Sequence, residues 1–411
     1  MRVTIKCFSK YWLALGCVLW AGSAMALVQE VTAVFRPDPV RPDHNQFINT
    51  TPVSGYCATW PDQCRGRFSI RLPLEIRANG PMAANPSDWR QAAYWKAPAQ
   101  WRTFTVVNSL GEEETVEMRI SGIGSTYRLD RPAAELVGGG IPSVTAHNKL
   151  WGLSWVSAPK PCQYSGVGFY GDAHYGFMWK TPVEERCVKL PKYPIPFMAY
   201  DYLDIVYELR TPNPLQMSAG LYSGTLTYGL GPLQDFDFGD VMLPLDSALS
   251  LNFSLTVEHI LRVVLPAGGN RVELLPQGGW QAWLHQGRPP SRLFRDQTFT
   301  LHASSRFKMQ LECGLVIGNT CGLRNEEGDE VPLQVGVTLP HSLIDQYGQA
   351  VTKRPLRLDG SGTELFQPVS YVNNRPASLH FEVEKAHVSQ MLKNPGSTYT
   401  GVATVIWDSE V

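Results

Sequence analysis

Apolar and polar residues alternate along much of this chain. A period of two is typical of a β-strand with one buried face. Turn-forming clusters rich in Gly, Pro, Asn and Asp separate the alternating segments. Many short strands divided by turns favour an all-β protein made of sandwiches over a parallel sheet covered by helices. Only 132–136 and 386–393 have a helical pattern. The clearest strand segments are 68–72, 103–107, 115–120, 203–207 and 379–383.

The first 26 residues have the pattern of a secretory signal peptide. Three cations, Arg2, Lys6 and Lys10, precede an apolar run at 11–20, and small residues surround a cleavage position after Ala26. The apolar run is about half the length that a membrane-spanning helix needs, so a membrane anchor is the weaker alternative. The remaining chain, 27–411, is expected to be exported.

A domain boundary is predicted between 258 and 259. The long alternating segment 249–257 ends there, and a new apolar segment, 260–265, begins at once. A Tyr-x-Gly triplet opens a β-type run both at 222–224 and at 399–401, and this repetition suggests two domains of similar plan. We therefore expect an N-terminal domain at 27–258 and a C-terminal domain at 259–411, joined by a very short linker.

Six cysteines remain after the signal peptide, an even number that suggests disulfides in an exported protein. Six cysteines permit fifteen pairings. Pairing between sequence neighbours is the simplest, and it gives Cys57–Cys64, Cys162–Cys187 and Cys313–Cys321. A zinc site is disfavoured because no Cys-x-x-Cys motif or adjacent histidine is present.

The composition and motifs give little support to an enzyme or a nucleic-acid binder. The formal net charge of −1 provides no excess of cations for phosphates. The chain lacks Gly-x-Ser-x-Gly, His-Glu-x-x-His and phosphate-loop motifs, so we expect no catalysis, cofactor or metal. Asp235 and Asp237 are expected on one solvated strand face, and His147 in a packing or surface role. A secreted carbohydrate-active enzyme stays open as an alternative, because its two carboxylates can be far apart in sequence.

The last strand of the chain is apolar on both faces. Tyr399, Gly401, Ala403, Val405 and Trp407 form one face, and Val402, Thr404 and Ile406 form the other. Such a strand is either covered within a complete sandwich or paired with a strand from another chain.

The chain resembles the tip adhesins of the alternate chaperone–usher pathway, a family that includes the colonisation factor antigen adhesins and the cable pilus biogenesis initiator. The resemblance extends over nearly all of the chain after the signal peptide. Its C-terminal half rests on the segments 260–266, 274–279, 304–313 with Cys321, and 396–408.

The resemblance implies two tandem immunoglobulin-like sandwiches. The first would bind a host receptor, and the second would be an incomplete pilin domain whose missing strand comes from another subunit. The expected partners are a periplasmic chaperone, an outer-membrane usher, a major pilin subunit that donates the strand, and a host glycan or glycoprotein. The expected location is the fimbrial tip at the cell surface, and the alternative within the family is an assembly initiator with little adhesion. The groove and chaperone contacts would involve Tyr399, Gly401, Val402, Val405, Trp407 and Val411.

The segment 27–35 is apolar on one face, so it could be a donor strand or the first strand of the N-terminal domain. The second interpretation is favoured, because domains ordinarily use their first strand internally.

The family's receptor-binding arginines cannot be transferred to this chain, because 51–56 and 228–234 contain none. Side chains near the first two cysteine pairs provide other candidates, since aromatic rings stack on sugars and arginines bind carboxylates. These candidates are Trp60, Arg65, Arg67, Tyr170, His174 and Lys180.

Overall fold

The computed structural model describes residues 26–409, apart from 65–66 and 167. The protein is all-β, as the alternating pattern predicts. The predicted signal peptide lies outside the described residues, except for Ala26, the first residue of β1. None of the described helices has the length and apolar content needed to cross a bilayer.

Residues 26–257 form what we call the N-terminal part. Its strands are β1 (Ala26–Phe35), β2 (Ile48–Asn49), β3 (Phe68–Leu72), β4 (Ile76–Ala78), β5 (Ala93–Trp95), β6 (Arg102–Val107), β7 (Glu113–Leu129), β8 (Gln163–Tyr164), β9 (Phe169–Tyr170), β10 (His174–Lys180), β11 (Cys187–Lys189), β12 (Met198–Tyr200), β13 (Leu203–Arg210), β14 (Gly220–Gly229), β15 (Met242–Pro244) and β16 (Ala248–Val257). Its helices are α1 (Tyr56–Thr59), α2 (Ala133–Leu136) and α3 (Ser143–Trp151), with short 3-10 turns at Pro61–Gln63, Trp89–Gln91 and Pro214–Gln216.

Residues 261–408 form the C-terminal part. Its strands are β17 (Leu261–Val264), β18 (Leu275–Pro276), β19 (Leu293–Ala303), β20 (Lys308–Cys313), β21 (Val316–Ile317), β22 (Thr320–Arg324), β23 (Glu330–Thr338), β24 (Leu343–Asp345), β25 (Arg354–Pro355), β26 (Phe366–Pro368), β27 (Val372–Val383) and β28 (Ala403–Asp408). Its helices are α4 (Gln281–Gln286) and α5 (Lys385–Met391).

The main sheet of the N-terminal part has the order β15-β4-β12-β7-β6-β14-β16-β1-β2. β16 pairs over ten residues with both of its neighbours, antiparallel to β14 and parallel to β1. The segment 27–35 is therefore an internal strand of this sheet, which is the favoured of the two interpretations. The five alternating apolar side chains of β16, Leu249, Leu251, Phe253, Leu255 and Val257, are all buried.

The C-terminal part has a separate set of sheets. One follows the order β17-β19-β27-β23-β22-β21, and β20 pairs with β28 in a sheet of two strands. Each part also has its own cluster of buried apolar side chains, one extending to Val257 and the other beginning at Leu293. The predicted division at 258/259 lies in the connection between β16 and β17.

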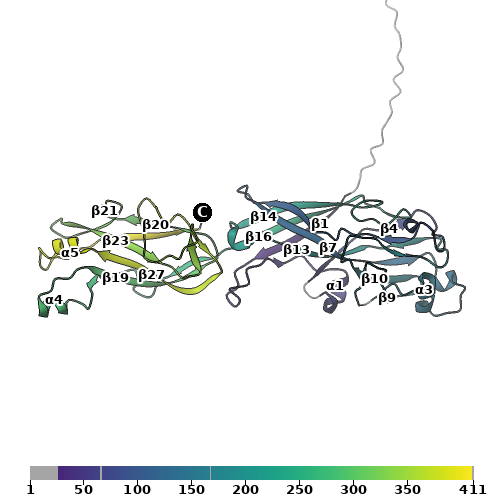
Figure 1. Cartoon of the computed structure of the whole chain (residues 1–411), viewed down its shortest axis with the longest axis horizontal. Helices are drawn as coiled ribbons and strands as arrows, with labels where there is room; N and C mark the ends of the chain where they lie inside the picture. The colour runs from purple at the N-terminus through teal and green to yellow at the C-terminus, as the bar shows by residue number, and fades with distance from the viewer. Residues whose placement is uncertain (1–25, 65–66, 167, 410–411) are drawn as a thin grey trace, which may run out of the picture.

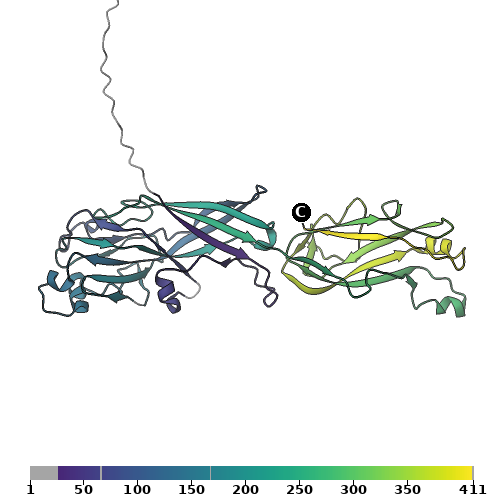
Figure 2. The same ribbon diagram turned by 180° about the vertical axis from the view of Figure 1, so that it is seen from behind.

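The two parts lie end to end, as Figures 1 and 2 show from opposite sides. His259 in the connection is held by both: its Nε2 lies 2.9 Å from the Met217 carbonyl oxygen, and its Nδ1 lies 3.2 Å from the Ser304 hydroxyl. Arg306 of the C-terminal part also donates to the Ser218 hydroxyl at 3.2 Å. Burial lowers the pKa of His259 in this junction.

The six cysteines form three disulfides between sequence neighbours: Cys57–Cys64, Cys162–Cys187 and Cys313–Cys321. The first closes the loop that contains α1, and its cysteines pack with Met178 and Val206 of the underlying sheet. This disulfide therefore shapes a loop that covers β10 and β13.

The two segments with a helical pattern, 132–136 and 386–393, contain α2 and α5. The alternation did not predict α3, which starts beyond the glycines at 138–140 and buries one face. His147 of α3 has a packing role, because its Nδ1 lies 2.6 Å from the Tyr127 hydroxyl and its Nε2 lies 2.8 Å from the Gly171 carbonyl oxygen.

The prediction for Asp235 and Asp237 was wrong. They do not lie on a solvated strand face: Asp237 is buried and accepts two hydrogen bonds from Arg90, and Asp235 accepts one from Arg102. Two arginines thus satisfy the pair, because a buried carboxylate requires a cationic partner.

Candidate functional sites: an open strand edge and a loop-covered face

In the described part of the chain, β28 has a strand partner along one edge. It runs antiparallel to β20 with six residue pairs, from Lys308 opposite Asp408 to Cys313 opposite Ala403. Upstream of β28, Thr400 exchanges two backbone hydrogen bonds with Arg324, each 2.9 Å long. Within the described residues, no strand pairs with the other edge of β28. Among the described residues, the backbone groups of 403–407 along that edge have no strand partner.

Apolar side chains flank this edge but are incompletely covered. Ala403, Val405 and Trp407 pack against the C-terminal core, yet none of them is fully buried. The first strand, β17, also packs only partly against that core through Leu261 and Val263. Val264 and Leu265 beside it are 38% and 43% exposed. The partly covered apolar side chains of β28 thus leave surface that a strand added along it would bury.

The N-terminal part provides an internal comparison. Its strand β14 carries the first Tyr-x-Gly triplet and lies between β6 and β16. The C-terminal copy of the triplet leads into β28, which has β20 on one side and no described strand on the other. Tyr222 of the first copy is fully buried, whereas Tyr399 of the second is only half-buried. β14 thus has a strand on each side, whereas β28 has a strand on one side in the described part of the chain.

The residues predicted for the groove divide into two groups. Tyr399, Val405 and Trp407 face the C-terminal core, on the strand face that the alternation indicated. Gly401 and Val402 precede β28, and a Cβ atom on Gly401 would lie 2.5 Å from the Gly322 carbonyl oxygen. Gly401 therefore permits close approach to β22, and Val402 is mostly exposed. Val411 lies outside the described residues.

Two buried polar atoms of the terminal segment have no hydrogen-bond partner among the described residues: the Tyr399 hydroxyl and the Trp407 indole nitrogen. Buried polar atoms are nearly always hydrogen-bonded in native proteins. Both side chains belong to the face of the terminal segment that packs against the C-terminal core.

The candidate receptor residues are only partly brought together. Trp60, Arg67 and Lys180 line two adjacent hollows under the Cys57–Cys64 loop, and Tyr56 lines both. Tyr170 and His174 lie on the β9–β10 hairpin, where both are exposed, and neither lines these hollows. Arg65 lies outside the described residues.

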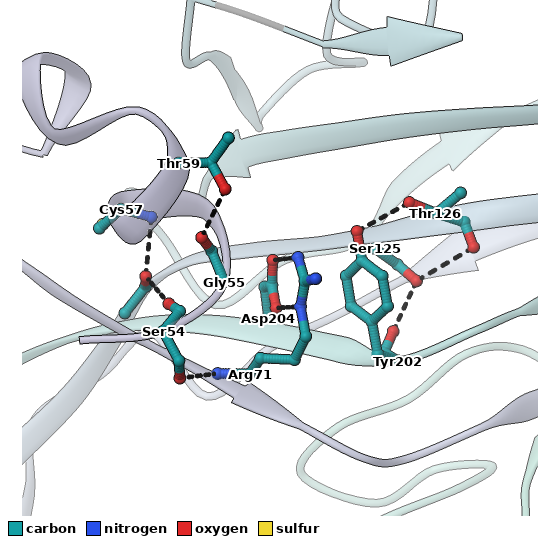
Figure 3. Close-up of polar contacts among 10 residues, drawn as sticks. Ser54, Gly55, Cys57, Thr59, Arg71, Ser125, Thr126, Tyr202 and Asp204 are labelled. Carbon is teal, nitrogen blue, oxygen red and sulfur yellow. Dashed lines mark hydrogen bonds and ion pairs between the residues drawn. The ribbon is translucent and has the colours of Figure 1, made fainter. Parts of the chain in front are cut away.

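We call the first hollow the aromatic hollow. It is lined by Tyr56, Thr59, Trp60, Arg71, Gly168, Phe169, Gly176, Phe177, Tyr202 and Asp204. At its floor Arg71 donates two hydrogen bonds of 2.8 Å to Asp204, and its guanidinium lies 3.6 Å from the centre of the Tyr202 ring (Figure 3). Burial raises the pKa of Asp204, and the ion pair with Arg71 opposes that rise.

The loop above this ion pair fits closely onto it. Gly55 has a φ of +68°, and a Cβ atom there would lie 2.4 Å from the Asp204 carboxylate. The Cys57 amide donates to the Ser69 hydroxyl at 2.9 Å, and the Arg71 amide donates to the Ser54 hydroxyl at 2.8 Å (Figure 3). Glycine is thus needed at position 55, both for the left-handed backbone and for space.

Arg71, Tyr202 and Asp204 were not predicted as site residues from the sequence. One signal was present: Asp204 interrupts the apolar run 203–207, and a carboxylate in a buried strand needs a cation nearby. The partner could not be identified from sequence, since 133 residues separate Arg71 from Asp204.

The described residues contain no group of three or more His, Cys, Asp and Glu side chains placed to hold a metal ion.

No family model matches the chain, and no curated protein matches it. Two solved structures span most of it. One comes from a chaperone–tip adhesin complex of CFA/I fimbriae, with 9% identity and a TM-score of 0.24 over 94% of this chain and 97% of the other. The second comes from a chaperone–tip adhesion subunit complex of the archaic chaperone–usher Csu pili of Acinetobacter baumannii, with 11% identity and a TM-score of 0.22 over 94% of this chain and 99% of the other. Similarity at this level carries no argument about function. A function can therefore be inferred only from the strands, side chains and contacts of this chain.

Proposed function

We propose that this protein is an exported pilus subunit located at the fimbrial tip, without catalytic activity. Its C-terminal region, 259–411, joins the pilus by accepting a donor strand from another subunit, and its N-terminal region, 27–258, binds a glycan-bearing receptor on a host cell. A periplasmic chaperone covers the open edge until an outer-membrane usher incorporates the subunit.

The observation that carries this proposal is the edge of β28 that no described strand covers, beside half-buried apolar side chains. An edge strand with exposed apolar neighbours is an aggregation hazard unless another strand covers it. An added strand supplies main-chain hydrogen bonds, and alternate side chains of that strand fill apolar positions in the groove. Complexes between pilus chaperones and pilins are an established example of this binding mode.

β16 indicates what kind of strand would fit. It runs antiparallel to β14 and places a bulky apolar side chain at every second residue. We expect the donor to run antiparallel to β28 in the same way, with alternating apolar residues directed into the core.

Fusion of a donor strand tests the assembly role. Residues 27–411 are extended by a flexible linker and the β16 sequence ALSLNFSLTV, and thermal unfolding is followed by calorimetry. We expect the transition of the C-terminal region to move to a higher temperature. The matched control replaces Leu251, Phe253 and Leu255 of the added copy with serine, which keeps the backbone donor but removes the apolar side chains. Equal melting temperatures for both fusions and the unextended chain would count against donor-strand complementation.

Adhesion is tested separately with the fused full-length chain on host epithelial cells and erythrocytes. Saturable binding that glycosidase treatment of the cells abolishes supports the receptor role. An assembly-competent chain that binds no cell type would instead be an initiator with little adhesion.

A further inference from the structure

A single histidine contacts both parts of the chain where they meet. The two parts lie end to end (Figures 1 and 2), and His259 belongs to the connection between β16 and β17. Its imidazole Nε2 lies 2.9 Å from the Met217 carbonyl oxygen of the N-terminal part. Its Nδ1 lies 3.2 Å from the Ser304 hydroxyl of the C-terminal part. One titratable side chain thus holds both parts through its two ring nitrogens.

The partners of the ring show which nitrogen carries hydrogen. A carbonyl oxygen can only accept, so Nε2 of His259 donates to Met217. The Ser304 hydroxyl oxygen accepts the Ile260 amide at 2.9 Å, which leaves the hydroxyl hydrogen of Ser304 to be donated to Nδ1. The imidazole with one hydrogen, on Nε2, therefore makes both hydrogen bonds.

A second proton, on Nδ1, would break this arrangement. The N–H groups of Ile260 and of Nδ1 would then both point at the Ser304 oxygen, and the hydroxyl hydrogen would have to turn away from the ring. Ser304 is fully buried, and its hydroxyl has no further hydrogen bond to a described residue. A buried hydroxyl hydrogen without an acceptor is unfavourable, so the contact with the C-terminal part requires the ring to have one hydrogen.

The charged groups around His259 also disfavour the imidazolium. Burial lowers the pKa of His259 most, its hydrogen bond to the carbonyl opposes this, and the positive charge of Arg306 lowers the pKa further. The adjacent carboxylate, Glu258, is held by Arg36 at 2.6 Å, and this hydrogen bond keeps the pKa of Glu258 below its ordinary value. From β1, the uncharged ring of Phe35 lies 5.8 Å from the imidazole. None of these neighbours favours a second proton on the ring, apart from the carbonyl that Nε2 already contacts.

Other polar contacts also connect the two parts. Arg306 donates to the Ser218 hydroxyl at 3.2 Å and lies 3.9 Å from the Glu112 carboxylate. Asn373 donates to the Pro39 carbonyl oxygen at 3.0 Å. Because these contacts do not involve the imidazole, loss of the His259 contact should loosen the junction without separating the two parts.

We propose that His259 is an acid-sensitive clamp that fixes the orientation of the N-terminal part relative to the C-terminal part. On protonation His259 stays bonded to Met217 but loses Ser304, and the C-terminal part pivots about 258–260. The clamped arrangement is fully stable above the ordinary histidine pKa of 6.5, and it loses stability as the pH falls below that value, because its own pKa is lowered. This inference goes beyond the proposed function and depends neither on the receptor nor on the strand donor.

Distance measurements in residues 27–411 test the proposal. Spin labels are attached to cysteines that replace Thr225 of β14 and Gln310 of β20, two exposed positions in different parts. Double electron–electron resonance then gives the distribution of distances between the labels from pH 7.5 to pH 4.5. We expect a narrow distribution at pH 7.5 and a second, broad population below pH 6.5. The ratio of broad to narrow should rise by at most about tenfold per pH unit, because one proton is taken up.

Two variants assign the effect to the clamp. His259→Gln can still donate to the Met217 carbonyl but cannot titrate, so its distance distribution should not change with pH. In Ser304→Ala the broad population should appear at a higher pH than in the parent, because the ring with one hydrogen loses its partner at Nδ1. His285→Gln is the matched control, since His285 is exposed on α4, at the end of the C-terminal part away from the junction (Figure 1). It should behave as the parent does.

A parent distribution that stays the same from pH 7.5 to pH 4.5 would overturn the inference. The same pH-dependent broadening in His259→Gln would also overturn it. Circular dichroism at each pH follows the β-sheet signal, and broadening that occurs only together with loss of that signal would be unfolding and would contradict a pivoting junction. Each of these results leaves the proposed pilus role unaffected.

Discussion

Replacing Arg71 by methionine should destabilise the N-terminal part strongly. The substitution keeps much of the aliphatic stem of the side chain but leaves the Asp204 carboxylate, whose side chain is 4% exposed, without its cation. Removing one partner of a buried ion pair costs about 3–5 kcal/mol, because the remaining charge is uncompensated. A loss of 1 kcal/mol lowers the melting temperature of a 150–250-residue domain by about 2–4 °C. We therefore expect the transition of the N-terminal part to fall by roughly 6–20 °C at neutral pH.

The loss of stability in Arg71→Met should decrease as the pH falls. Burial already raises the pKa of Asp204 above its ordinary value of 3.8, and loss of Arg71 removes the interactions that oppose this rise. An acid whose pKa is raised on folding favours the folded state below its unfolded pKa and loses that contribution as the pH rises through the folded pKa. The penalty of Arg71→Met should thus be full at neutral pH and shrink as the pH falls toward 4.

Arg77→Met is the matched control. Arg77 also donates two hydrogen bonds of 2.8 Å to a carboxylate, that of Glu75, but the Glu75 side chain is 26% exposed, whereas that of Asp204 is 4% exposed. Exposed pairs contribute about 0–1 kcal/mol. Calorimetry of both variants between pH 4 and 7.5 checks the reasoning. The reasoning would be refuted if Arg71→Met had the same melting temperature as Arg77→Met. It would also be refuted if the loss of stability in Arg71→Met did not change with pH.

Three further predictions concern other parts of the chain. Replacing Cys162 and Cys187 by alanine should lower the free energy of unfolding by about 3 kcal/mol, because this disulfide joins residues 25 apart and restricts the unfolded chain. Urea unfolding measures the change, and an unchanged midpoint of the urea transition would contradict the prediction. Gly401→Ala should destabilise the C-terminal part by about 1–3 kcal/mol, since the new Cβ atom would lie 2.5 Å from the Gly322 carbonyl oxygen. Gly314→Ala, whose new Cβ atom would have its nearest contact at 3.4 Å, should lower the stability less. Equal losses of stability in the two variants would show that the close approach at Gly401 is unimportant. Burial lowers the pKa of His147, so the folded protein loses stability as the pH falls below the ordinary histidine pKa of 6.5. His147→Gln should reduce this loss of stability in calorimetry between pH 7 and 5. A pH profile of stability that the substitution leaves unaltered would refute a role of His147 in the acid sensitivity.

The strands were predictable because alternation is a local property. The segments 203–207 and 379–383 show the period of two directly, and they lie in β13 and β27. The helix α3 was not predicted, because it follows a glycine cluster and its short apolar face gives a weak period. The Asp235–Asp237 prediction failed because it assumed a strand, whereas the two carboxylates instead bind Arg102 and Arg90 from distant segments.

In the candidate sites, too, only the residues with a local sequence signal could be predicted. Trp60, Arg67 and Lys180 could be nominated because they flank cysteines, and those cysteines fold their loop over β10 and β13. Asp204 could not be assigned a role, since its environment depends on Arg71, a partner far away in sequence. Long-range pairing determines these environments, and no local pattern encodes it.

Hydrogen exchange along β28 in the lone chain tests the central claim most directly. In a strand paired on one edge, alternate amides point to the unpaired side and are not protected by a ladder. We predict that amides of 403–408 alternate between slow and fast exchange, while β16, which is paired with β14 and β1, is protected throughout. Uniform protection of 403–408 in the isolated protein would contradict an open edge, and with it the need for a strand from a second polypeptide.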